Sequence, residues 1–186
     1  MTPFIVLTAP AAVLDRANVD TDQIIPARFL LKPRTAGYQH FLFADLGIRL
    51  PAGAAILVAG DNFGCGSSRE GAVYALVDAG IRCVIAPSFG DIFAGNAAQN
   101  GLLTVALPAD ARPGLRDGDT LTVDLPAETL RLPDGTTCRF PIDAFRKRRL
   151  LEGLDDIGLT LTHAAEIAAF EARDAGMRAW ASPGPG

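Results

Sequence analysis

Apolar and polar positions alternate in blocks through the middle of the chain, and the blocks have the lengths of strands and helices. Residues 54–59 form a continuous apolar run, and residues 67–79 place apolar side chains at helical spacing. A second apolar run covers residues 81–86, a second helical pattern covers 87–101, and a third run covers 102–107. Strands that alternate with helices predict a parallel βαβ core and an α/β fold class.

The pattern is weaker before this core. Residues 4–7 predict a short strand, and residues 23–26 predict an extended run. The acid-rich segment at 18–22 has turn chemistry, because short polar side chains bond nearby backbone amides. Asp20 and Asp22 could instead position basic groups near a substrate, although turn capping is the simpler interpretation. Residues 29–43 mix charged, aromatic, glycine and proline positions without a clear period, so we expect a long mobile loop there, of a kind that is often functional.

Short alternating strands replace this pattern after residue 119. Strands are predicted at residues 121–125, 129–132 and 137–142. The dipeptide Asp134-Gly135 lies between two of them and is a strong signal for a tight antiparallel turn. The sequence therefore predicts antiparallel hairpins joined to the parallel core.

Two amphipathic helices are predicted after the hairpins, at residues 143–152 and 163–175. The last residues, 176–186, are rich in Ala, Pro and Gly and resemble a flexible tail. A chain of 186 residues is long enough to bury one sizeable core but short for two. We expect a single domain over residues 1–175.

Charge and composition restrict the partners. The formal net charge is -4 and the isoelectric point is near 5.1, whereas binding to nucleic acid or to an anionic membrane needs clustered excess Lys and Arg. No apolar stretch approaches the ~20 residues that cross a bilayer, and the N-terminus lacks the pattern of a signal peptide. We expect a small-molecule ligand, no nucleic acid, no membrane span and a cytoplasmic location.

The three cysteines are Cys65, Cys83 and Cys138. They are odd in number, far apart and in no Cys-x-x-Cys spacing, so they predict neither a disulfide framework nor a self-contained metal site. If a metal takes part in the chemistry, another chain must hold it.

Residues 60–70 carry the strongest candidate chemistry, with the sequence GDNFGCGSSRE. They lie between a predicted strand and a predicted helix, the position where parallel sheets bind ligands. Glycines let backbone amides approach a ligand, and a helix N-terminus favours negative charge. Arg69 can add paired hydrogen bonds to a carboxylate. The loop therefore predicts a site for a small anion, with Ser67 and Arg69 facing it.

A structural alternative remains open for the same residues, because Ser67-x-x-Glu70 is also the signature of a helix capping box. Other functional readings have less support. The loop lacks the Gly-Lys-Ser/Thr ending and the Gly-x-Gly-x-x-Gly spacing of nucleotide loops. It also lacks the Gly-x-Ser-x-Gly elbow of hydrolases, and the chain has only two histidines, His40 and His163, for a triad.

Several segments resemble one family in the right order. The sequence DNFGCGSSRE at 61–70 resembles the signature of the swivelling domain of the aconitase superfamily. More narrowly, four further segments are similar to bacterial 3-isopropylmalate dehydratase small subunits: NVDTDQIIP at 18–26, VIAPSFGDIF at 84–93, IDAF at 142–145 and GLDDIGLTL at 153–161. The resemblance spans about residues 4–170 and implies a three-layer β/β/α swivelling domain.

The resemblance implies a function as well. Such small subunits belong to a hydro-lyase that interconverts 2-isopropylmalate and 3-isopropylmalate by dehydration and rehydration, in leucine biosynthesis. A separate large subunit would hold a [4Fe-4S] cluster, and this chain would hold no metal or cofactor. By the same resemblance, Ser67 would be the catalytic base. Arg69 and Ser68 would bind the dicarboxylic acid substrate, with Arg28 and Arg34 as weaker candidates.

One position departs from the family pattern. The run usually continues Arg-Glu-His, but Gly71 follows Glu70 here, which removes a polar neighbour of the loop. A related hydro-lyase acting on citraconate or a methylmalate is therefore an alternative, and so is a non-catalytic anion-binding module. Two further features have a plain interpretation and functional alternatives. His40 is expected to be an exposed loop residue, with contact to substrate as the alternative. The basic run 146–149 is expected to be a solvated helix face, with a nucleic-acid patch or a docking surface for the large subunit as the alternatives.

Overall fold

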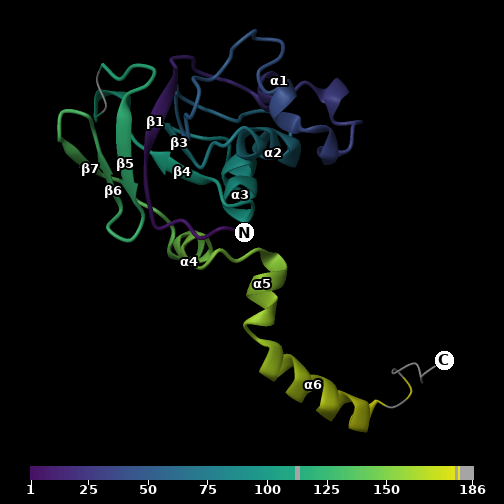
Figure 1. The fold of residues 1–186 in the computed structure, drawn as a ribbon. Coiled ribbons are helices and arrows are strands. Elements are labelled where there is room, and N and C mark those ends of the chain that lie inside the picture. Colours follow the sequence, from purple (N-terminus) through teal and green to yellow (C-terminus); the bar gives the residue numbers. More distant parts are fainter. Residues whose placement is uncertain (112–113, 179, 181–186) are drawn as a thin grey trace.

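A computed structural model describes residues 1–111, 114–178 and 180 of the chain. Its centre is one seven-stranded sheet with the order β4-β3-β2-β1-β5-β6-β7, which Figure 1 shows as a curled surface. The strands are β1 Val6–Leu14, β2 Ile56–Ala59, β3 Cys83–Ala86, β4 Leu103–Ala106, β5 Thr120–Asp124, β6 Thr129–Arg131 and β7 Thr137–Arg139.

The parallel half of the sheet confirms the predicted βαβ core. Strands β1, β2, β3 and β4 pair in parallel, and helices α2 (Glu70–Asp78) and α3 (Asp91–Gln99) connect β2 to β3 and β3 to β4. The residues of β2 and β3 are all buried, which explains their continuous apolar runs. Both helices are shorter than expected, since α2 begins three residues after the predicted start.

Strand β1 is longer than the sequence indicated, because only residues 4–7 were expected and the strand reaches Leu14. Its first half pairs antiparallel with β5 and its second half pairs parallel with β2, so β1 joins the two halves of the sheet. Pro10 weakened the strand signal, yet its carbonyl still accepts a hydrogen bond from the Ala55 amide (3.2 Å).

The sheet separates two apolar cores. Alternate residues of β2 face opposite sides: Leu57 packs with α2 and α3, whereas Ile56 packs with β5 and β6 through Val123 and Leu130. The antiparallel strands therefore curl over the face of the parallel strands that the helices leave uncovered. Helices, parallel strands and antiparallel strands form the three layers of the expected β/β/α swivelling domain, which confirms the predicted fold class.

The segment before β2 differs from expectation. Residues 23–26 were predicted to be extended, but a short helix, α1, spans Thr21–Ile24. Residues 29–43 were predicted to be a long mobile loop, and the structure has three short 3₁₀ turns at Ala27–Phe29, Arg34–Ala36 and Tyr38–Phe41. Tyr38 and Phe43 are buried in the core beside α2, so this segment packs as part of the domain.

The chain ends in helices α4 (Ala144–Glu152), α5 (Asp156–Leu161) and α6 (Ala164–Met177). Helix α4 lies against the body, whereas α5 and α6 extend away from it in Figure 1. Because α6 continues to Met177, it enters the predicted tail. The rest of that tail, except for residues 178 and 180, lies outside the described residues. In the described ranges, no helix is long and apolar enough to cross a membrane.

Candidate functional site

The serine loop, which we define as residues 61–69, follows β2 and is held on both sides by the segments that follow β1 and β3. The Gly64 amide donates to the Val19 carbonyl (2.7 Å), and the Thr21 amide donates to the Cys65 carbonyl (2.9 Å). On the other side, the Phe63 amide donates to the Ser88 carbonyl (3.1 Å). The loop therefore lies at the carboxyl end of three parallel strands, where the sequence predicts the ligand site.

Two glycines in this region are required by close packing. Gly64 has a φ of 74°, and a Cβ at this position would lie 2.3 Å from Cγ of Phe93. At Gly90, a Cβ would lie 2.6 Å from the Gly64 carbonyl oxygen. The loop can therefore lie flat against α3 only because neither position carries a side chain.

Ser67 does not cap the helix, so the capping-box alternative is wrong. Helix α2 begins at Glu70, its N-cap is Arg69, and no side chain caps it. Arg69 still has an extended backbone, with φ -124° and ψ 98°. Ser67 and Ser68 are exposed, and no group in the described part of the chain hydrogen-bonds to the Ser67 hydroxyl. That hydroxyl is open to a ligand.

A capping box does form next to this loop, at Asp20. The Asp20 carboxylate accepts from the Gln23 amide (2.7 Å), and the Gln23 side chain accepts from the Asp20 amide (3.1 Å). Thr21, which is 2% exposed, donates its hydroxyl to the Ser67 carbonyl (3.0 Å). Helix α1 thus fixes the backbone of Ser67 without using its side chain.

Arg69 is held by the last acidic residue of the same segment. Its guanidinium donates to Oδ1 of Asp22, and this oxygen also accepts from the Ala27 amide (2.8 Å). The Ala27 hydrogen bond and the Arg69 guanidinium hold the pKa of Asp22 below its ordinary value. Because Asp22 stays ionised, it anchors Arg69 at the end of the serine loop. The sequence favoured turn capping for this acid over the positioning of a basic group, and it did not identify Arg69 as that group.

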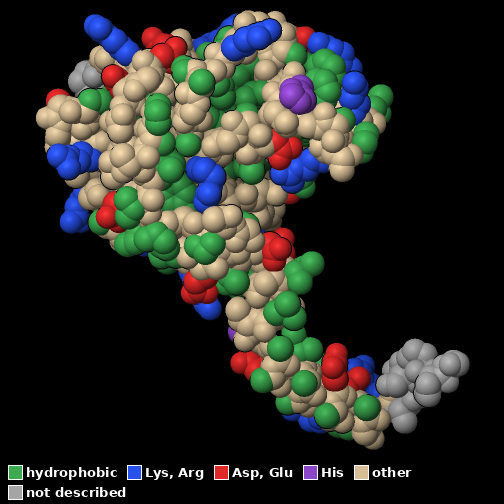
Figure 2. Space-filling model, viewed as in Figure 1, with side chains coloured by type: hydrophobic (Ala, Val, Ile, Leu, Met, Phe, Trp, Pro, Cys, Tyr) green, Lys and Arg blue, Asp and Glu red, His purple; other side chains and the backbone are tan. Residues whose placement is uncertain are grey.

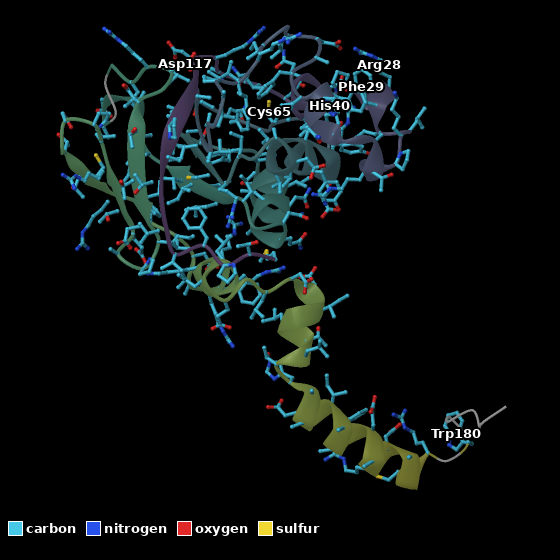
Figure 3. The ribbon with its side chains drawn as sticks, in the orientation of Figure 1. Arg28, Phe29, His40, Cys65, Asp117 and Trp180 are labelled. Carbon is cyan, nitrogen blue, oxygen red and sulfur yellow. The ribbon has the colours of Figure 1, made fainter. Side chains whose placement is uncertain are left out.

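Arg28 lies near this pair. Its guanidinium donates to Asp45 and stacks 4.5 Å from the ring centroid of Phe29. The interaction with Arg28 lowers the pKa of Asp45. Hydrogen bonding to Asp45 and, beyond it, the charge of Asp22 raise the pKa of Arg28, so the two ion pairs lie close together; Figure 3 shows Arg28 beside Phe29. The structure therefore brings Arg28 into the charged surroundings of Arg69.

Arg34 has a different location. Its guanidinium pairs with Asp78 (Nη2 to Oδ1, 2.6 Å) and stacks 4.1 Å from the ring centroid of Tyr74. Asp78 is the last residue of α2, and the eight steps back to Glu70 span about 12 Å along the helix axis. The ion pair therefore holds Arg34 toward the end of α2 opposite Ser67.

Gly71 lies against Leu30, a neighbour that the sequence did not reveal. A Cβ at this position would lie 2.4 Å from Cδ2 of Leu30 and 3.5 Å from Cε2 of Tyr38. Leu30 thus occupies the space that a side chain at position 71 would need. Its neighbour Glu70 accepts a hydrogen bond from Asn100 (2.8 Å) and does not turn back toward Ser67.

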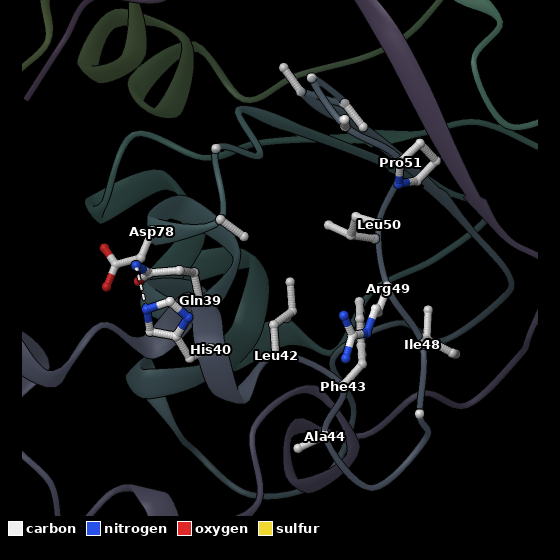
Figure 4. A pocket seen from close by; sticks show the side chains of 17 residues that line it. Gln39, His40, Leu42, Phe43, Ala44, Ile48, Arg49, Leu50, Pro51 and Asp78 are labelled. Carbon is white, nitrogen blue, oxygen red and sulfur yellow. Dashed lines mark hydrogen bonds between the residues drawn. The ribbon is translucent and has the colours of Figure 1, made fainter.

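A cavity away from the loop at residues 61–69 is lined by residues that precede β2 and β3. It measures about 860 Å³ and lies between the 3₁₀ turn at Tyr38–Phe41, the segment before β2 and the end of α2. Figure 4 shows His40 beside Gln39 on its wall, with Arg49 across from them. His40 is therefore an exposed residue at the rim of this cavity and does not lie in the serine loop.

The basic run 146–149 is only partly a solvated face. Arg149 is 5% exposed and pairs with Asp156 (2.8 Å), and Lys147 pairs with Glu128 (2.7 Å). The expectation of a solvated face is therefore wrong for Arg149. The buried Arg149 side chain pairs with Asp156, which is the first residue of α5.

The cysteines lie in different parts of the fold. Cys83 is buried in β3, where burial raises the pKa of its thiol, and Cys138 donates from β7 to the Ala111 carbonyl (3.2 Å). Cys65 lies half-buried in the serine loop. Across the ranges that the structure covers, no group of three His, Cys, Asp or Glu side chains is arranged to hold a metal ion. These residues do not fit an iron–sulfur cluster.

Three family models match consecutive parts of the chain. The aconitase C-terminal domain matches residues 42–110, and the LeuD_N model matches 116–144. The model of the C-terminal domain of the 3-isopropylmalate dehydratase small subunit matches 156–181. The first match contains the serine loop, and the third contains α5 and α6.

Curated relatives and a solved structure agree with these matches. The 3-isopropylmalate dehydratase small subunit of Magnetococcus marinus is 45% identical over 97% of this chain and 99% of its own length. The protein of the same name from Anaeromyxobacter is 48% identical over 92% of this chain and 98% of its own length. A crystal structure of 3-isopropylmalate dehydratase from Methanocaldococcus jannaschii matches with a TM-score of 0.71 and 31% identity, over 90% of this chain and 99% of that one.

Proposed function

Because the chain belongs to the family of 3-isopropylmalate dehydratase small subunits, we propose that it acts with a large subunit to interconvert 2-isopropylmalate and 3-isopropylmalate in leucine biosynthesis. The observation that carries the site assignment is the exposed Ser67 hydroxyl, which does not cap α2 and has Arg69 two residues away. The chain itself is one part of a hydro-lyase, and its activity requires the partner.

The partner would hold a [4Fe-4S] cluster, since the three cysteines of this chain are too dispersed to bind one. When bound, such a cluster supplies a Lewis-acidic iron for the hydroxyl and a carboxylate of the substrate. The remaining chemistry is the movement of a carbon-bound proton and the placement of the carboxylates. Those tasks fall to the residues of the serine loop.

Ser67 would take the proton from the carbon beside a carboxylate and return it in the rehydration step. A serine hydroxyl is a weak acid, so an alkoxide needs surroundings that favour negative charge. The N-terminus of α2 has positive partial charge and Arg69 has a full charge, and both lie within a few residues of Ser67. Thr21 adds rigidity by holding the Ser67 carbonyl.

Arg69 would bind a substrate carboxylate with paired hydrogen bonds, and Ser68 would donate one more. Arg28 is the stronger of the two remaining candidates for the second carboxylate, because it is near Asp22 and Asp45 in the same charged group. Arg34 is the weakest candidate, because its pair with Asp78 holds it toward the end of α2 opposite Ser67.

Reconstitution with a cluster-loaded large subunit tests this function. The assembled pair should convert either isopropylmalate isomer into the other, with absorbance from the unsaturated intermediate, while each subunit alone should be inactive. The substrate panel should include citraconate and methylmalates, because Gly71 departs from the family pattern. Faster turnover of one of those acids would replace the isopropylmalates as substrates, and a silent pair would leave only an anion-binding module.

A further inference from the structure

Helices α5 and α6 form a C-terminal arm, which we define as residues 156–178. No side chain of α6 is buried, and none of α5 is buried either. In Figure 1 the arm leaves the body after α4 and extends well beyond it. At its base, the buried Arg149 guanidinium pairs with Asp156, and the amino group of Met1 donates to the Gly153 carbonyl (3.0 Å). The base is thus fixed, whereas no residue of α5 or α6 is buried against the described body.

The arm carries a row of large apolar side chains. Ile167, Phe170 and Met177 lie on one face of α6, because their spacing of three and seven residues returns to the same side of a helix. Ile157 and Leu161 have the equivalent spacing of four in α5. Phe170 is 52% exposed and Ile157 is 71% exposed. Figure 2 shows hydrophobic side chains along the arm.

Such a face is unfavourable in water. A helix of 14 residues is marginal on its own, and most helical stability in proteins comes from packing of an apolar face. The family model for the C-terminal domain of such small subunits covers residues 156–181, which is almost the same segment. A segment that matches this family model, and whose described helices bury none of their apolar side chains, points to a surface on another chain.

We propose that the apolar face of the C-terminal arm docks into a groove on the large subunit. This inference rests on the proposed function for the identity of the partner. The mode is that of an amphipathic helix in an apolar groove, with Ile167 and Phe170 as central anchors.

A second copy of this chain fits the face less well. Sustained pairing of helices needs about three to four heptads of apolar positions, whereas α6 has two, and Asp174 interrupts them. The arm also carries four carboxylates against two arginines, so two arms would bring like charges together. A larger partner with an apolar groove and a basic rim avoids both problems.

Two matched double variants test the proposal in the full chain. The first, Ile167→Glu with Phe170→Glu, places two charges on the apolar face. The control, Ala165→Glu with Ala172→Glu, places the same two charges on the opposite face, where both alanines are exposed. None of the four side chains is buried, so both variants should keep the wild-type melting temperature.

Affinity for the large subunit, measured by biolayer interferometry, should fall about 30-fold or more in the first variant and less than about 3-fold in the control. Turnover at saturating large subunit should remain near the wild-type value in both. Equal affinities for the two variants would overturn the docking proposal while leaving the function intact.

Analytical sedimentation of the chain alone tests whether a second copy of this chain occupies the apolar face. A wild-type dimer that Ile167→Glu with Phe170→Glu dissociates would assign the face to a second copy and contradict the proposal. If the wild-type chain and the large subunit bind each other through the arm but turn over no isopropylmalate, the proposed function fails and the docking surface stands.

Discussion

Two neighbouring segments carry the same local signature and use it differently. Asp20-x-x-Gln23 and Ser67-x-x-Glu70 both fit a helix capping box, and they lie side by side through the bridge between Asp20 and Cys65. The box forms at Asp20. It does not form at Ser67, where the chain stays extended through Arg69 and the helix begins at Glu70. One polar side chain stabilises the fold, and the other remains available for chemistry.

Long-range contacts explain the difference. At Ser67, Thr21 holds the serine carbonyl and Asp22 holds the guanidinium of Arg69, so both ends of the segment are fixed before the helix can start. At Asp20, the side chain meets its own helix directly. A capping signature therefore expresses a local preference, and contacts from a distant segment decide whether the cap forms.

The largest expected effect comes from Ser67→Ala. If the hydroxyl serves chemistry and not the fold, this variant should lower kcat of the assembled enzyme by about 10³-fold, as expected for loss of a proton-transferring group. The free energy of unfolding, measured by urea titration of the isolated chain, should change by less than about 0.5 kcal/mol. A loss of about 1 kcal/mol would restore the capping role and break the comparison. Ser68→Ala is the matched control, with a smaller decrease in kcat.

Arg69→Lys tests whether Arg69 binds a substrate carboxylate through two nitrogens. Lysine keeps the charge but lacks the planar fork that binds a carboxylate through two nitrogens, so kcat/KM for isopropylmalate should fall about 10- to 100-fold. Steady-state kinetics of the reconstituted pair give the value. Unchanged kcat/KM would mean that Arg69 pairs with Asp22 and does not bind the substrate.

The parallel core was predictable because its runs are wholly buried, as in β2 and β3, so the apolar pattern is continuous. The serine loop was also predictable from its glycines and its place between strand and helix. Strand β1 was underestimated because Ala and Pro carry little strand signal. The start of α2 and the pairing of Asp22 with Arg69 were not predictable, since both depend on residues more than forty positions apart.

Asp22→Asn tests whether the segment that contains Asp20 positions Arg69 in the serine loop. Asparagine can still accept from the Ala27 amide but loses the charge that fixes Arg69, so the KM for isopropylmalate should rise about 10-fold with little change in kcat. Asp45→Asn removes the same charge from Arg28 and is the matched control, with an expected rise below about 3-fold. A fall in kcat with constant KM would place Asp22 in the proton transfer instead.

Asp20→Ala should give the smallest effect, and the effect should be of the opposite kind to that of Ser67→Ala. It removes the hydrogen bond from the Gln23 amide to the Asp20 carboxylate, while the backbone amide of residue 20 can still donate to the Gln23 side chain, and should lower the free energy of unfolding by about 1 kcal/mol. Asp20→Asn should retain most of this stability, since asparagine caps as well as aspartate. Because Asp20 does not contact Arg69, kcat should stay within about 2-fold of wild type at a temperature well below unfolding. Urea titration and kinetics on the same preparations would show whether stability and turnover are separable between these adjacent segments, and a kcat loss as large as that of Ser67→Ala would show that they are not.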